Sequence, residues 1–187
     1  MLTHQQRTTL LRIARDSIAA ALDGRRLDLD SYPIDDALRR PSGAFVTLNE
    51  SNGDLRGCIG SIVPTAPLYQ AVSSSAINAA FRDPRFYPVK REELPELHLE
   101  ISVMRPIERV KDPNEIEVGR DGLIVSRGPF AGLLLPQVAL EYGWDRETFL
   151  SHTCAKAGLP GDAWRSEVTK IERFSAEVFA EQVTEYK

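Results

Sequence analysis

The stretch from Gly43 to Ile62, GAFVTLNESNGDLRGCIGSI, consists of two runs of alternating apolar and polar residues on either side of Asn52-Gly53. Asn-Gly readily takes the two positive φ angles of a type I′ turn, so the stretch predicts a β-hairpin with a two-residue loop. Because paired positions mirror each other about the loop, the register follows from the sequence. It places Leu48 opposite Gly57, Thr47 opposite Cys58, Val46 opposite Ile59 and Asn49 opposite Arg56.

This register gives the hairpin two different faces. The face expected to lie against the core carries Val46, Leu48, Leu55 and Ile59. The opposite face carries Thr47, Asn49, Arg56 and Cys58. Gly60 follows on the same face and, having no side chain, leaves its backbone accessible. A thiol and a guanidinium among polar neighbours are typical of a functional site, so we expect the site on this second face.

Length and composition restrict the class of protein. A chain of 187 residues with 42% hydrophobic composition is sufficient for one domain with one core. The net charge of −4 provides no overall positive field to attract nucleic acid. Cys58 and Cys154 show no CxxC spacing, which suits a reducing compartment. The first residues do not read as a basic segment followed by an apolar run, and no run approaches the ~20 apolar residues of a membrane span, so we expect a soluble, cytoplasmic protein.

Periodic apolar residues predict helices on both sides of the hairpin. Thr3 and Gln6 form a capping box for the first helix, and Thr65 is expected to cap the helix that follows the hairpin. Gly24 and Gly158 are expected to end two of the helices. The expected helices run from Thr3 to Gly24, around Ile34–Leu38, from Ala66 to Asp83, and from Asp145 to Ala157.

Alternating residues also predict strands after the hairpin. Residues 97–104 alternate strictly and are expected to join the hairpin sheet, with Glu100 on the same face as Arg56 and Cys58. Beyond Pro106, short runs broken by turn residues predict a second, smaller β unit. The tail from Val168 to Glu181 is expected to return as one long bent strand of the main sheet. The expected subdomains are a larger one, about 1–105 and 165–187, and a smaller one, about 106–164.

Several motifs follow one another over nearly the whole chain. They are Leu55-Arg56-Gly57-Cys58-Ile59-Gly60, Asp83-Pro84-Arg85-Phe86, Glu100-Ile101-Ser102-Val103, Leu134-Leu135-Pro136-Gln137-Val138, Trp144 and Lys156-Ala157-Gly158-Leu159. With these motifs the chain resembles the AMMECR domain family, whose signature is the hairpin hexapeptide. The resemblance implies a single AMMECR domain of α+β class, with a larger antiparallel sheet flanked by helices, a smaller β-containing subdomain, and a cleft between them.

The resemblance also implies a biological setting. The chain resembles the proteins called AmmeMemoRadiSam system protein A. These proteins are encoded beside a radical S-adenosylmethionine enzyme and a Memo-type protein of dioxygenase-like fold. The implied partners are therefore these two proteins, in a three-component system. The family name by itself specifies no reaction.

The candidate catalytic residues are Cys58, Arg56 and Glu100. Arg56 lies two residues from Cys58 on the same strand face, where its charge favours the thiolate. A nucleophilic cysteine also needs a base, for which His98 and His152 are the candidates. In the alternative interpretation, Cys58 is a small buried filler and Arg56 pairs with Glu100 as a structural ion pair.

A second set of residues is predicted to bind the substrate. It comprises Thr47, Asn49, Gly57, Gly60, Arg85, Phe86, Gln137 and His152. The two glycines either let a ligand approach the backbone or only make room for packing. A metal site at His152 and Cys154 is discounted, because residues two apart on a helix point away from each other. We expect neither a metal nor a cofactor.

Three classes of function follow. In the first, the protein binds and modifies a small or peptide-borne substrate in a cleft lined by Arg56 and Cys58, as a cysteine-dependent enzyme. In the alternative, it is a non-catalytic adaptor that docks the partner enzymes through the same cleft by protein–protein interaction. A nucleic-acid-associated regulatory role through the arginines and aromatics of residues 82–87 is the weakest, because the chain is acidic.

Overall fold

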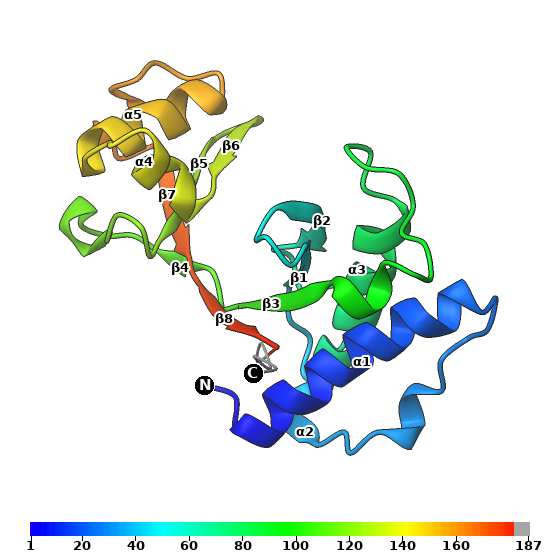
Figure 1. The fold of residues 1–187 in the computed structure, drawn as a ribbon. Helices are drawn as coiled ribbons and strands as arrows, with labels where there is room; N and C mark the ends of the chain where they lie inside the picture. The colour runs from blue at the N-terminus through cyan, green and yellow to red at the C-terminus, as the bar shows by residue number, and fades with distance from the viewer. Residues whose placement is uncertain (182–187) are drawn as a thin grey trace. The chain divides into compact units, whose positions relative to one another are not determined.

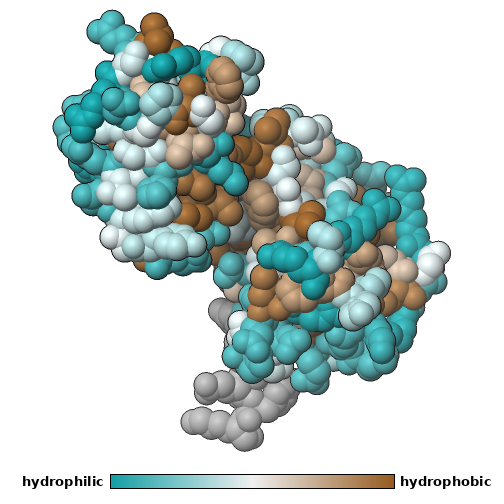
Figure 2. Space-filling view, turned by 90° about the horizontal axis from the view of Figure 1, so that it is seen from above, coloured by the Kyte–Doolittle hydropathy of each residue, from teal (hydrophilic) through white to brown (hydrophobic). Residues whose placement is uncertain are grey.

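The computed structural model describes residues 1–181 and has an α+β fold built on two four-stranded antiparallel sheets (Figure 1). The described residues form two compact units, one made of Met1–Met104 with residues 177–181, the other of Arg105–Ala176. Hydrophilic residues predominate on the surface of both units in the view from above (Figure 2). None of the helices in residues 1–181 has the length and apolar character needed to cross a bilayer. The cleft expected between the two parts stays a prediction.

The first unit contains one sheet with strand order β2-β1-β3-β8. Its elements are α1 (His4–Leu22), η1 (Leu29–Ser31), α2 (Asp36–Arg39), β1 (Ala44–Asn49), β2 (Leu55–Ser61), α3 (Leu68–Phe81), η2 (Leu94–Glu96), β3 (His98–Met104) and β8 (Ala176–Ala180). Helices α1 and α3 pack together and against one face of the sheet (Figure 1). The core between them is formed by fully buried side chains such as Leu10, Ile13, Val46, Leu48, Val72, Leu99 and Ile101.

The first helix begins and ends as its sequence predicts. The Gln6 backbone N–H donates to the Thr3 hydroxyl at 3.2 Å, and the Thr3 N–H donates to the Gln6 side chain at 2.7 Å, which completes the capping box. Gly24 follows the helix with φ +63°. The short helix expected around residues 34–38 is α2.

Helix α3 begins two residues later than the sequence suggests. Its N-cap is Pro67, which provides no side-chain hydrogen bond, and Thr65 is exposed, so the prediction of Thr65 as the cap is wrong. The reason is a long-range contact, because Pro41 and Pro67 form an isolated β-bridge and the Leu68 N–H donates to the Arg40 carbonyl at 3.0 Å. This pairing holds the residues before Leu68 in an extended conformation.

The hairpin has the predicted register up to Leu48 but a different turn. Three of the four predicted pairs are present: Leu48 with Gly57, Thr47 with Cys58 and Val46 with Ile59. The fourth is wrong, because a register shift after Leu48 places Asn49 opposite Leu55 instead of Arg56. The turn is closed by the Gly53 N–H, which donates to the Glu50 carbonyl at 2.8 Å. Among the described residues, only glycines have positive φ, so Asn52 does not adopt the type I′ conformation.

This longer turn also changes the apolar face of the hairpin. Val46 and Leu48 are fully buried as predicted, and Ile59 packs against the core while half-buried. Leu55, however, is 39% exposed, so its assignment to the core face is wrong. It follows the turn and lies where the pairing is irregular.

The second unit contains the other sheet, with strand order β4-β7-β5-β6. Its elements are β4 (Glu108–Arg109), η3 (Pro113–Glu115), β5 (Gly122–Arg127), β6 (Phe130–Leu134), α4 (Pro136–Glu141), α5 (Arg146–Lys156), η4 (Ala163–Arg165) and β7 (Lys170–Phe174). Helix α5 follows an Asp145 N-cap, as predicted, and contributes Phe149 and Leu150 to a core shared with Leu123 and Ile171.

The C-terminal segment is not one long strand of the main sheet. Strand β7 pairs with β5 and β4 in the second sheet, whereas β8 belongs to the first sheet. Residues 165–176, expected with the larger subdomain, cluster with the second unit. The division between the two units falls after Ala176, the first residue of β8.

Candidate functional site

Three side chains from neighbouring strands form a row on the sheet of the first unit. Cys58 of β2 pairs with Thr47 of β1, and Thr47 pairs with Glu100 of β3. Side chains at paired positions lie on the same face of a sheet. The Thr47 hydroxyl donates to the Cys58 sulfur at 3.3 Å. The prediction that Glu100 shares a face with Cys58 is therefore confirmed.

The face opposite α1 and α3 is half-buried along its length. We call it the Cys58 face and define it by Phe45, Thr47, Asn49, Arg56, Cys58, His98, Glu100 and Ser102. Every one of these side chains is partly exposed, whereas Val46, Leu48, Leu99 and Ile101 on the other face are fully buried. The Cys58 face thus presents a thiol and several polar groups to solvent.

The backbone of Cys58 is held from the side by the loop after α3. The Cys58 N–H donates to Asp83 Oδ2 at 2.9 Å, and Arg85 Nη2 donates to the Cys58 carbonyl at 3.3 Å. Strand β2 is at the edge of its sheet, where backbone groups otherwise lack partners. These two contacts fix the position of the thiol.

Asp83 and Arg85 are themselves a tightly bonded pair. Arg85 donates to the Asp83 carboxylate from Nε at 2.9 Å and from Nη2 at 2.7 Å. These hydrogen bonds, assisted by the Cys58 N–H, outweigh burial and hold the pKa of Asp83 well below its usual range. From the sequence, Arg85 is expected at the site and Asp83 only at the end of a helix. The signal available was an aspartate two residues before an arginine in the Asp-Pro-Arg motif.

Arg56 has a different partner from the one expected. Its Nε lies 2.9 Å from Glu93 Oε1, so the predicted pairing with Glu100 is wrong. The side chain is 11% exposed, and its Nη1 is buried with no hydrogen-bond partner among the described residues. Burial would raise the pKa of Glu93, but the hydrogen bond from Arg56 and the Lys90 N–H lower it overall. Arg56 is therefore a fixed positive charge at the edge of the Cys58 face.

Phe86 lies near both arginines of the site. Its ring centroid is 6.0 Å from the Arg56 guanidinium carbon and 5.4 Å from that of Arg85. At these distances the ring face attracts a cation. Phe86 therefore connects the loop after α3 with the side chain of Arg56.

The two predicted substrate-binding glycines have packing roles. Gly57 is buried on the α3 side, where a Cβ would overlap the carbonyl oxygen of Ala79. A Cβ on Gly60 would lie 2.5 Å from Phe45 Cγ. This supports the alternative that both glycines make room for neighbours.

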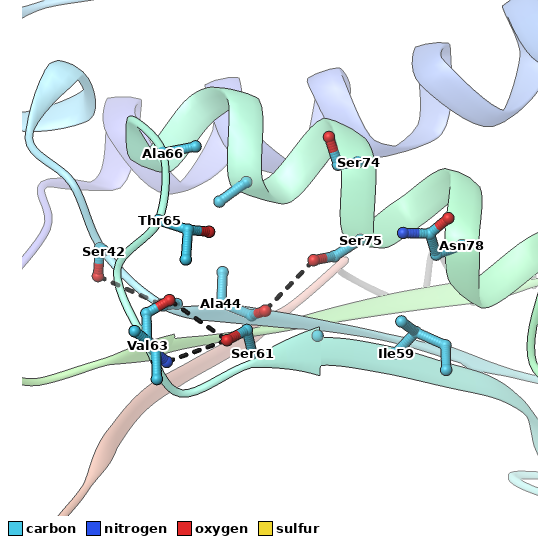
Figure 3. A pocket seen from close by; sticks show the side chains of 13 residues that line it. Ser42, Ala44, Ile59, Ser61, Val63, Thr65, Ala66, Ser74, Ser75 and Asn78 are labelled. Atoms are coloured by element: carbon cyan, nitrogen blue, oxygen red, sulfur yellow. Dashed lines mark hydrogen bonds between the residues drawn. The ribbon is translucent and has the colours of Figure 1, made fainter.

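Gly60 also borders a cavity between the end of the hairpin and α3. The cavity has a volume of about 210 Å³ and is lined by hydroxyl-bearing side chains, including Ser42, Ser61, Thr65, Ser74 and Ser75 (Figure 3). The Ser75 hydroxyl donates to the Ala44 carbonyl at 3.3 Å across it. Cys58 is not among the lining residues, so this cavity is separate from the Cys58 face.

Gln137 and His152 belong to the second unit. Both are exposed, and His152 stacks on Trp144 with ring centroids 3.9 Å apart. That they share a site with Cys58 stays a prediction. Cys154 is fully buried in the core, and burial raises the pKa of its thiol. Within residues 1–181, no group of three or more metal-ligating side chains converges.

Comparison with known proteins shows similarity over almost the entire chain. The model of the AMMECR1 family matches residues 11–179. Protein PF1979 of Pyrococcus furiosus is 49% identical, with 92% of this chain and 87% of that protein covered. Protein MJ0810 of Methanocaldococcus jannaschii is 45% identical, with 97% and 92% covered. The crystal structure of the uncharacterized protein PH0010 from Pyrococcus horikoshii is similar with a TM-score of 0.72 at 46% identity, covering 92% of this chain and 90% of that one.

Proposed function

The chain belongs to the AMMECR1 family, and on this premise we propose that it binds a small or peptide-borne substrate on the Cys58 face and acts on it through the thiol. It does so as one component of a three-protein system with a radical S-adenosylmethionine enzyme and a Memo-type protein, the partners that the family resemblance implies. Two free cysteines suit the reducing cytoplasm as the place of this activity.

The hydrogen bond from the Thr47 hydroxyl to the Cys58 sulfur carries this proposal. This donor holds the sulfur in one orientation, as a nucleophile that attacks a bound substrate requires. A cysteine that only fills space is found buried, as Cys154 is, whereas Cys58 is partly exposed. The contacts of Asp83 and Arg85 with its backbone keep the sulfur in place for a bound substrate.

Acylation of the Cys58 thiol by a substrate is a reaction that these side chains suit. The Cys58 sulfur forms a bond to the acyl carbon while the bond from that carbon to its leaving group breaks. The thiol proton passes to the leaving group, so no electrons are gained or lost. Glu100 is two strand spacings from Cys58, roughly 10 Å away, a distance at which it contacts the substrate instead of the thiol.

Reconstitution with both partner proteins tests the proposal. Wild type, Cys58→Ser and Cys154→Ala are each combined with the radical enzyme and the Memo-type protein, and products are detected by mass spectrometry. We expect a product with wild type and with the Cys154→Ala control, and none with Cys58→Ser, although Cys58→Ser still binds both partners in a pull-down. Product at the wild-type level with Cys58→Ser would instead show a non-catalytic adaptor.

A further inference from the structure

A cavity in the second unit is lined by three arginines. It has a volume of about 210 Å³, and Arg105, Arg120 and Arg173 contribute to its wall together with Glu108 and Asp121. All of these residues lie within Arg105–Ala176, so the cavity belongs to one compact unit. It contains none of the residues assigned above to the Cys58 face.

A buried carboxylate orients Arg120. Asp121 is 2% exposed and accepts hydrogen bonds from Arg120 Nε at 2.8 Å and Nη2 at 2.7 Å. The same carboxylate accepts the Glu117 N–H at 2.9 Å. Since its oxygens are occupied by donors, Asp121 acts mainly to hold the Arg120 fork in one orientation.

Arg173 is fixed in a similar way by other groups. Its Nε and Nη2 donate to Glu108 Oε2 at 3.2 and 3.0 Å, and its Nη1 donates to the Glu115 carbonyl at 2.6 Å. Its Nη1 also lies 3.9 Å from Asp121 Oδ2. A guanidinium has five N–H donors, so Arg173 and Arg120 each keep donors that these contacts do not use.

Arg105 differs from the other two because its guanidinium is free. Within residues 1–181 its side chain forms no hydrogen bond or ion pair, although its backbone N–H donates to the Ser175 carbonyl at 2.8 Å. The backbone is therefore anchored beside the cavity while all five side-chain donors remain available. Arg120 Nη1 also bonds the Glu117 carboxylate, so three carboxylates are paired with Arg120 and Arg173, and among residues 1–181 only the Arg105 guanidinium of the three has no carboxylate partner.

We propose that this cavity binds a phosphate group, with Arg105 as the free guanidinium and Arg120 and Arg173 as the fixed ones. Three arginines lining one space, each with N–H donors that its protein contacts leave unused, suit an oxyanion with three or four acceptor oxygens better than a carboxylate with two. The group is either free inorganic phosphate or the phosphoryl end of a small molecule. This site is independent of the thiol chemistry proposed for the first unit.

Calorimetric titration of the full chain tests the site with inorganic phosphate and with glycerol 3-phosphate as probes. The variants are Arg105→Gln, which loses no protein contact, and the control Arg165→Gln, whose partner Glu147 lies on the surface away from the cavity. We expect saturable binding to wild type and to Arg165→Gln, and affinity at least about tenfold weaker for Arg105→Gln. Tighter binding of glycerol 3-phosphate than of phosphate would identify a phosphorylated small molecule, and the reverse order free phosphate.

Two results would overturn the proposal. One is the absence of saturable binding of either probe at low ionic strength, where charge attraction is least screened. The other is binding that Arg105→Gln leaves unchanged, or that acetate matches in affinity. Cys58→Ser is expected to bind both probes as wild type does, so failure of this site and failure of the thiol proposal are measured separately.

Discussion

The backbone N–H of Cys58 donates to the carboxylate of Asp83 at 2.9 Å, and this contact joins the edge strand β2 to the loop after α3. Asp83 is almost completely buried, yet its low pKa keeps it ionised near neutral pH. The position of the proposed nucleophile therefore depends on a charged residue that follows it by 25 positions in the chain.

Replacing that carboxylate by an amide should weaken the fold. Asp83→Asn keeps the shape but loses the charge-assisted hydrogen bonds with Arg85 and Cys58, so we expect about 1–3 kcal/mol less free energy of unfolding in urea titrations. The control Asp54→Asn changes an exposed residue of the hairpin turn, and we expect it to alter the free energy of unfolding by less than about 0.5 kcal/mol. Equal losses in the two variants would contradict the assigned role of Asp83.

The stability difference between wild type and Asp83→Asn should depend on pH. The pKa of Asp83 is lower in the folded than in the unfolded chain, so its contribution to stability is fully present above the unfolded value of about 4. It is lost progressively as pH falls below that value toward the folded pKa. Urea titrations at a series of pH values should therefore show the stability difference between wild type and Asp83→Asn constant near neutrality and shrinking below about pH 4. A constant difference throughout would argue against a depressed pKa.

Gly57 should not tolerate a side chain. In Gly57→Ala the new Cβ overlaps the Ala79 carbonyl of α3, and because this is backbone the helix must move, at a cost of about 1–3 kcal/mol. In the control Gly161→Ala the nearest atom, Ser151 Cβ, is 3.7 Å away, so we expect a change below about 0.5 kcal/mol. Thermal unfolding of both variants measures the difference. Unchanged stability of Gly57→Ala would mean that α3 lies farther from β2.

The ion pair between Arg56 and Glu93 should matter more than an exposed pair. Glu93→Gln leaves a guanidinium that is 11% exposed without its anion, and we expect a loss of about 1–3 kcal/mol. Glu147→Gln breaks the pair with Arg165, in which both side chains are at least 60% exposed, and is expected to cost less than about 1 kcal/mol. Chemical denaturation measures the free energy of unfolding of both variants. A larger loss for Glu147→Gln would contradict the greater contribution assigned to the pair of Arg56 and Glu93.

Thr47→Val tests the hydroxyl that donates to the Cys58 sulfur. Valine has nearly the same shape but no donor, so loss of the hydrogen bond should slow alkylation of Cys58 by about fivefold, equivalent to ~1 kcal/mol. The rate is followed by mass spectrometry of the peptide containing Cys58. Asn49→Ala, on the same face but without a hydrogen bond to the sulfur, is the control and should react at the wild-type rate. An unchanged alkylation rate in Thr47→Val would show that the Thr47 hydroxyl does not affect the reactivity of Cys58.

Local sequence predicts the features that depend on neighbouring residues. The pairing of Thr47 with Cys58 follows from alternation and from mirror symmetry about the turn, and the placement of Glu100 follows from alternation on one further strand. The turn itself escapes prediction, because hydrogen bonds at Glu50 leave only Gly53 with positive φ. The sequence pattern does not reveal that the hydrogen bonds of Glu50 with Gly53 and Asp54 close a longer turn than the predicted two-residue loop.

Features that depend on distant partners are the ones that sequence analysis misses. Arg56 had Glu100 as a plausible partner on its own sheet, but the residue that reaches it is Glu93, from the segment before β3. The tail after residue 168 has uniform β character, and only the pairing of β7 with β5 shows that it serves two sheets. Asp83 appears as a helix terminator until its bond with the Cys58 backbone is seen.

The most direct test of the central claim is the rate at which iodoacetamide alkylates Cys58 in the native protein, compared with the same cysteine in the unfolded chain at the same pH. A partly exposed thiol that accepts a hydrogen bond from Thr47 should react faster when the protein is folded, while the buried Cys154 should react only after unfolding. Native Cys58 reacting no faster than unfolded Cys58 would contradict the account and leave Cys58 as a structural residue.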